Sequence, residues 1–102
     1  MQKILSDNLE QIKALCTKYE VRSMYAFGSI VSKTFTKQSD IDLLISFKES
    51  LSLDQYTDNY FSIHHDLNTL LNKKIDLITE KSLKNPYFIE SLNSSKLLIY
   101  AA

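Results

Sequence analysis

Residues 26–29 read Ala-Phe-Gly-Ser, and residues 40–45 read Asp-Ile-Asp-Leu-Leu-Ile. In a β-strand, side chains two positions apart point to the same face, so Asp40 and Asp42 are expected to project together. The apolar residues that alternate with them face the other way, into a core. Two like charges on one face repel each other unless a cation lies between them, and hard divalent cations such as magnesium prefer oxygen ligands. The second run therefore predicts a strand over residues 40–47 that carries metal-binding carboxylates.

The first run predicts where phosphates bind. A β-prone segment over residues 23–27 ends in Gly28, which is the only glycine in the chain. Glycine permits a tight turn and close approach of the backbone to a ligand. Ser29 follows it, and a helical turn over residues 30–32 would offer N–H groups and a hydroxyl to an anion. A phosphate cradle joined by a short excursion to a carboxylate pair predicts a site for a nucleoside triphosphate.

This arrangement of Gly28-Ser29, ten residues and Asp40-Ile41-Asp42 resembles the signature of the DNA polymerase β-like nucleotidyltransferase superfamily. The flanking residues 25–27 and 43–45 are similar to those of its small members, the minimal nucleotidyltransferases (MNT proteins). The resemblance extends over most of the chain. One departure concerns residues 31–33, which read Val-Ser-Lys where many relatives have a small residue and then a glycine.

Length and composition set outer limits on the interpretation. The chain has 102 residues, which predicts a single domain over residues 1–102. Twelve basic and twelve acidic side chains give a formal net charge of zero, which disfavours dedicated nucleic-acid binding. The lone Cys16 indicates a reducing compartment and is expected to be a small buried hydrophobe. Without a signal peptide or a membrane-length apolar run, a cytoplasmic protein is expected, with no membrane partner.

Helical and strand patterns alternate along the chain. Apolar residues at helical spacing predict one helix over residues 5–19 and a second over residues 52–72, which Ser52 and Gln55 would open as a capping box. Asp7 with Glu10 would form a capping box for the first helix, or that helix begins earlier and runs through Ile4. Residues 74–79 read as a strand, Asn85-Pro86 would open a short helix, and residues 96–100 would add an edge strand. The pattern predicts an α+β or α/β protein. The family resemblance implies the nucleotidyltransferase fold, a small mixed sheet with helices packed on one side.

Asp76 lies within the apolar strand 74–79, where an unpaired buried carboxylate would be costly. It is either an edge-strand residue in water or a third acidic site residue, and the family resemblance favours the second reading. Lys33 and Lys37 either reach a triphosphate or are solvated loop charges. The adjacent His64 and His65 point about 100° apart on a helix, so a shared metal site is not expected.

The resemblance implies a reaction in which AMP is transferred from ATP to an acceptor hydroxyl. In that scheme Asp40, Asp42 and Asp76 are the catalytic residues and the ligands of two magnesium ions. Nucleotide binding would fall to Gly28, Ser29, Lys33 and Lys37.

The resemblance also implies a partner, because small relatives often act as the antitoxin of a HEPN-domain ribonuclease toxin. In such a pair the nucleotidyltransferase adenylylates a tyrosine of the toxin. Two alternatives are a non-catalytic antitoxin that neutralises its partner by contact and an enzyme that modifies a small molecule such as an aminoglycoside. Homo-oligomerisation is left open.

Overall fold

One mixed sheet forms the centre of the molecule, and the computed structural model describes all residues from 1 to 102. Its strand order is β3-β2-β1-β4, in which β2 and β3 are parallel and the other two pairs are antiparallel. The strands are β1 (Val21–Phe27), β2 (Ile41–Phe47), β3 (Ile75–Thr79) and β4 (Leu97–Ala101). The helices are α1 (Lys3–Ser6), α2 (Leu9–Lys18), α3 (Leu53–Leu71) and α4 (Pro86–Ser95), with two 3₁₀ turns, η1 (Gly28–Val31) and η2 (Glu80–Ser82).

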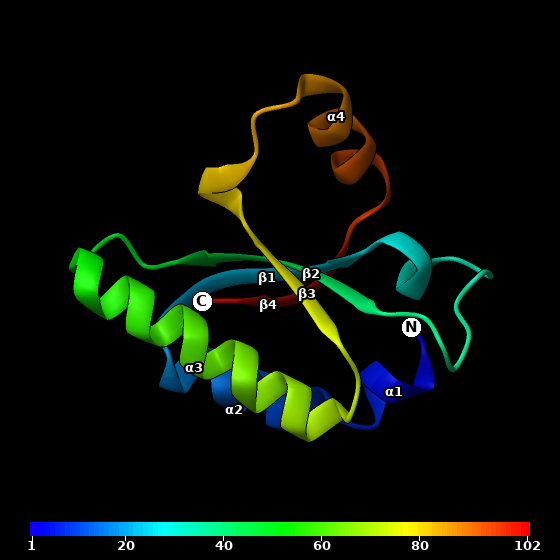
Figure 1. Cartoon of the computed structure of the whole chain (residues 1–102), viewed down its shortest axis with the longest axis horizontal. Coiled ribbons are helices and arrows are strands. Elements are labelled where there is room, and N and C mark those ends of the chain that lie inside the picture. The colour runs from blue at the N-terminus through cyan, green and yellow to red at the C-terminus, as the bar shows by residue number, and fades with distance from the viewer.

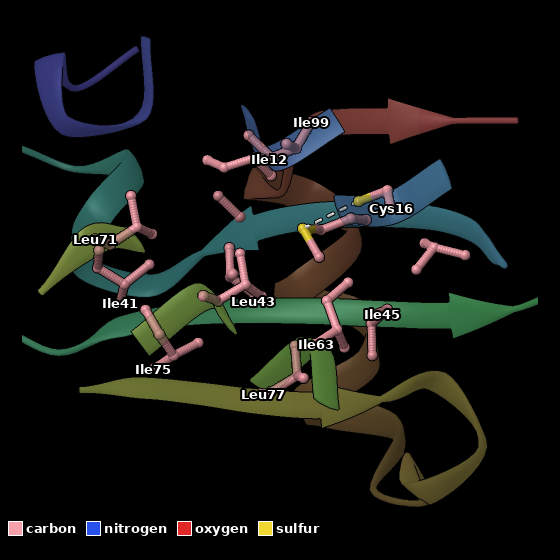
Figure 2. Packing of buried hydrophobic residues seen from close by; sticks show 14 of the residues in the cluster. Ile12, Cys16, Ile41, Leu43, Ile45, Ile63, Leu71, Ile75, Leu77 and Ile99 are labelled. Carbon is pink, nitrogen blue, oxygen red and sulfur yellow. Dashed lines mark hydrogen bonds between the residues drawn. The ribbon is translucent and has the colours of Figure 1, made fainter. Parts of the chain in front are cut away.

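The main core lies between one face of the sheet and helices α2 and α3. Figure 1 shows these helices on one side of the sheet, with α1 beside them. Leu43 and Ile45 of β2 are fully buried there, as the alternation of β2 predicts, and Ile63 of α3 lies beside them (Figure 2). Ile12 of α2 belongs to the same buried cluster and lies next to Ile99 of β4 (Figure 2). Cys16 is buried in the same cluster beside Met24, and burial raises the pKa of its thiol to about 12. Cys16 is therefore a packing residue, as predicted.

The opposite face of the sheet is covered by α4 over a smaller area. Leu92 of α4 is buried against Phe27 and Leu44, which point away from the main core. Figure 1 shows α4 on this side, away from α2 and α3. The expected one-sided arrangement thus holds for α2 and α3, while α4 adds a second, thin layer on the other face.

Side chains of α3 hydrogen-bond to the outer edge of β3. Tyr60 donates its hydroxyl to the carbonyl of Leu77 at 2.6 Å, and His64 Nε2 lies 2.7 Å from the carbonyl oxygen of Ile75. Asn68 accepts the N–H of Ile75 at 2.9 Å. Because these three side chains are four residues apart, they lie along one line of α3. They hydrogen-bond the backbone groups of β3 on the edge that has no neighbouring strand. This contact fixes the strand that carries Asp76.

The helix starts follow the sequence with one exception. The capping box of Ser52 and Gln55 is present at α3, and Asn85 caps α4 as predicted. The helix expected over residues 5–19 is instead broken at Asp7 and Asn8 into α1 and α2, and Asn8 makes no side-chain cap. The Asn8 amide donates to the carbonyl of Ile4 instead, which ends α1. None of the helices is both long and apolar enough to cross a membrane.

Replacement of Asn68 by Ala is expected to lower the free energy of unfolding by about 1–2 kcal/mol, because the Ile75 N–H loses its only side-chain acceptor in a partly buried place. Urea unfolding of the variant measures this loss. The matched control is Thr69→Ala, at an exposed position on the same helix. Equal stability of Asn68→Ala and the wild type would mean that the α3 contact does not hold β3.

Candidate active site

The parallel register of β2 and β3 places two carboxylates beside each other. Asp42 is the register partner of Asp76, and both point to the face opposite the main core. Asp76 is exposed and Asp42 is half-buried. The structure therefore brings together the two acids that the sequence separates by 34 positions in the chain. Asp76 lies on an edge strand and is exposed, as the first of its two predicted readings required, and it also lies beside Asp42 of the predicted site.

The environment of Asp42 disfavours its charged form. Burial raises the pKa of Asp42 above the usual aspartate value, and the negative charges of Asp76 and Asp40 and a carboxyl contact with Asp76 raise it further. These causes are the ones expected of acids that share a site without a cation. The site thus stores electrostatic repulsion that a bound cation would relieve.

Asp40 lies immediately before β2 and is exposed. Its Oδ2 is 3.7 Å from Nζ of Lys74, the residue before β3. Ile41 and Ile75 are the first register partners of β2 and β3, so the residues before them, Asp40 and Lys74, also lie beside each other. Lys74 was not predicted as a site residue, although Lys74-Ile75-Asp76 repeats the spacing of Asp40-Ile41-Asp42. The spacing alone could not place Lys74 beside Asp40, because their proximity depends on the parallel pairing of β2 with β3.

The turn after β1 lies directly against Asp42. Phe27 and Asp42 are register partners, so Gly28 begins η1 next to the carboxylate. Gly28 has a φ of +73°, and a Cβ added there would overlap Oδ2 of Asp42. Glycine is therefore required both by the left-handed backbone and by the space. Ser29 is half-buried in η1, so the Gly-Ser turn and the carboxylates share one end of the sheet, as predicted.

The loop between η1 and β2 carries the two lysines predicted to bind nucleotide. Lys33 and Lys37 are exposed, and neither lies within ion-pair distance of a carboxylate. Lys73 anchors this loop by donating to the carbonyls of Lys37 and Ser39, at 2.6 and 3.1 Å. The loop geometry does not assign either exposed lysine to the site.

The donor set suits a hard divalent cation. All candidate ligands are carboxylate oxygens, Asp42 and Asp76 are register partners, and the negative charges around Asp42 favour a positive charge between them. No group of three or more acidic, histidine or cysteine side chains is already gathered closely enough to hold a metal ion. Magnesium commonly takes one or two carboxylates together with substrate phosphate oxygens, and Asp42 with Asp76 beside the Gly28 turn fits that pattern.

Known proteins are similar to this chain in sequence. The sequence profile of the nucleotidyltransferase domain matches residues 9–99. The chain belongs to the nucleotidyltransferase domain family. It is 38% identical over 87 residues to "Putative protein adenylyltransferase MJ0126" of Methanocaldococcus jannaschii, with 85% of each chain covered. It is also 31% identical to "Protein adenylyltransferase MntA" of Thermococcus cleftensis, over 76% of this chain and 82% of that protein.

Solved structures agree with the nucleotidyltransferase fold. A toxin–antitoxin crystal structure with AMP-PNP matches with a TM-score of 0.71 at 18% identity, over 93% of this chain and 74% of that chain. A complex of a tri-AMPylated Shewanella oneidensis HEPN toxin with an MNT antitoxin matches with a TM-score of 0.65 at 16% identity, over 95% and 72%. At these identities the likeness establishes the fold.

In metal-free buffer, Asp42→Asn is expected to raise the melting temperature of this nucleotidyltransferase at pH 7. The folded state raises the pKa of Asp42, so it disfavours loss of the proton, and the resulting destabilisation grows as pH rises through the ordinary aspartate pKa of about 4. The advantage of the neutral amide should therefore be largest near neutral pH, shrink as pH falls through the raised pKa of Asp42, and disappear below about 4.

Scanning calorimetry with a chelator across this pH range measures the difference. Asp58→Asn, an exposed position on α3, serves as the control for loss of one surface charge. A melting temperature for Asp42→Asn that equals or falls below the wild-type value at pH 7 would contradict the repulsive pair.

Proposed function

We propose that this chain is a magnesium-dependent protein adenylyltransferase that transfers AMP from ATP to a tyrosine hydroxyl of a HEPN-domain toxin, and so acts as its antitoxin. The observation that carries the proposal is the placement of Asp42 and Asp76 as register partners on adjacent parallel strands, with the Asp42 carboxylate against the Gly28 turn. Acidic residues on adjacent strands next to a glycine turn suit a nucleotide whose phosphates arrive with a divalent cation.

The comparisons support the choice of donor and acceptor. Sequence relatives that cover most of the chain are named protein adenylyltransferases. Among the proteins of the same fold, one toxin–antitoxin structure contains AMP-PNP, and another pairs an MNT antitoxin with an AMPylated HEPN toxin. An ATP donor and a protein acceptor are therefore the substrates that best suit this chain.

Each site residue has a role in this proposal. Asp40, Asp42 and Asp76 would hold magnesium, which supplies charge neutralisation at the phosphates and polarises the acceptor oxygen when it is bound. Gly28 and Ser29 would bind the β- or γ-phosphate through the backbone N–H of η1 and the Ser29 hydroxyl. The flexible side chains of Lys33 and Lys37 stand outside this centre and would meet the phosphates only from the loop.

The chemical step forms one bond and breaks another. The acceptor oxygen bonds to the α-phosphorus, the bond from that phosphorus to the bridging oxygen breaks, and pyrophosphate leaves. A tyrosine hydroxyl has a pKa near 10, so it must lose its proton to become a strong nucleophile at neutral pH. Asp76 is the exposed member of the pair and would accept this proton, while the half-buried Asp42 stays fixed against Gly28. Most of the rate enhancement then comes from positioning and charge neutralisation.

The proposal predicts that a HEPN-domain toxin purified with this chain gains the mass of AMP after incubation with ATP and magnesium. Asp42→Asn should reduce the rate of this gain by about a hundredfold or more, because metal-based stabilisation of the transition state is worth several kcal/mol. Intact-mass spectrometry measures the modification, and size-exclusion chromatography checks that the complex still forms. Asp58→Asn is the matched control and should transfer AMP at the wild-type rate.

The same experiment separates the alternatives. If the toxin is silenced without a mass gain, and Asp42→Asn silences it equally well, the chain acts by contact alone. If the toxin stays unmodified and active while an added aminoglycoside gains AMP, the acceptor is a small molecule.

A further inference from the structure

An aromatic pair borders the carboxylates on the α4 side of the sheet. The rings of Phe27 and Phe88 meet edge to face, with centroids 6.1 Å apart and an interplanar angle of 81°. Phe27 is the register partner of Asp42 and directly precedes Gly28. Phe88 therefore lies one side chain away from the residues that would bind metal and phosphate.

The two rings differ in exposure. Phe27 is 8% exposed and closes the small cluster with Leu92, whereas Phe88 is 39% exposed in the first turn of α4. Leu92 already provides the buried contact between α4 and the sheet. Packing of α4 thus leaves a large part of the Phe88 ring free, next to the site.

Other exposed apolar side chains lack this connection to the carboxylates. Phe61 is 64% exposed on α3, which covers the opposite face of the sheet, and Leu98 is 50% exposed on the edge strand β4. Tyr87 is 82% exposed on α4, but adjacent helical residues point about 100° apart, so it cannot share the direction of Phe88. Phe88 is the exposed aromatic ring held against the register partner of Asp42.

A nucleotide bound at this end of the sheet carries one flat aromatic group, the base. The exposed part of an aromatic ring is a natural surface for such a group, because every nucleobase has a π-face that stacks on aromatic side chains. In the proposed function, the phosphates of the nucleotide are met by the carboxylate-bound cation and the Gly28 turn. The base is the part left without a partner, and an exposed ring adjoins the site.

We propose that Phe88 is a positioning residue that stacks on the base of the donor nucleotide, with Phe27 holding its ring from behind. This inference rests on the proposed function and adds a base-recognition surface on α4. Because stacking reads no hydrogen-bond pattern, Phe88 should strengthen binding of purine nucleotides generally and does not by itself select adenine.

The test compares ATP with inorganic tripolyphosphate, which has the phosphates but no base. Calorimetry with magnesium should show that Phe88→Ala binds ATP about tenfold more weakly while its affinity for tripolyphosphate is unchanged. Phe88→Leu, which keeps an apolar contact with Phe27 but lacks a flat ring, should show the same selective loss. Phe88→Trp should retain ATP binding, and Tyr87→Ala should alter neither ligand.

Three results would overturn the inference. Wild-type affinity of Phe88→Leu for ATP would exclude stacking, and equal weakening of ATP and tripolyphosphate would show that the ring only supports the fold of the site. Unchanged ATP affinity with a raised KM for the protein acceptor would place the acceptor ring on Phe88 instead. In each of these cases the wild type still binds ATP, so the proposed function survives. A wild type that binds neither ligand would reject both proposals.

Discussion

The parallel register that places Asp42 beside Asp76 is the constraint on which the arrangement of this end of the molecule depends. The parallel β2–β3 register forces the two carboxylates together, and burial of Asp42 makes its charge costly. Several features lie around this pair. Gly28 leaves room for the Asp42 carboxylate, Lys74 pairs with the neighbouring Asp40, and side chains of α3 hold the edge strand that carries Asp76. The folded state tolerates this destabilising carboxylate pair, which suits a site that binds a divalent cation together with phosphate groups.

The two faces of the sheet divide the work. One face is closed by α2 and α3 over the large apolar core, which supplies most of the burial. The other face carries the carboxylates and is covered by α4 over only a small cluster around Leu92. The thin cover leaves the end of the sheet near Gly28 accessible and places Phe88 at its border. The face covered by α2 and α3 therefore provides most of the stability, and the opposite face of the same sheet carries the candidate site.

Features that depend on residues close together in the sequence could be predicted from the sequence. The alternation of β2, the turn at Gly28 and the caps at Ser52 and Asn85 follow from side-chain spacing and hydrogen-bonding groups, and the structure confirms each of them. Nothing local shows which strands pair. The position of α4 across the sheet, the Lys74 ion pair and the Phe88 contact depend on register and topology, so spacing alone could not place them. The apolar stripe continues through Asp7 and Asn8, so the pattern allowed a start at Asp7 or a longer helix and did not show that two separate helices form.

The most direct measurement of the central claim is calorimetric titration of the wild-type chain with ATP, once with magnesium and once with a chelator. If the carboxylates are held together to receive a cation with the phosphates, magnesium should strengthen ATP binding markedly, because it replaces carboxylate–phosphate repulsion with shared coordination. Equal ATP affinity with magnesium and with the chelator would contradict the claim that Asp42 and Asp76 form a metal-dependent nucleotide site.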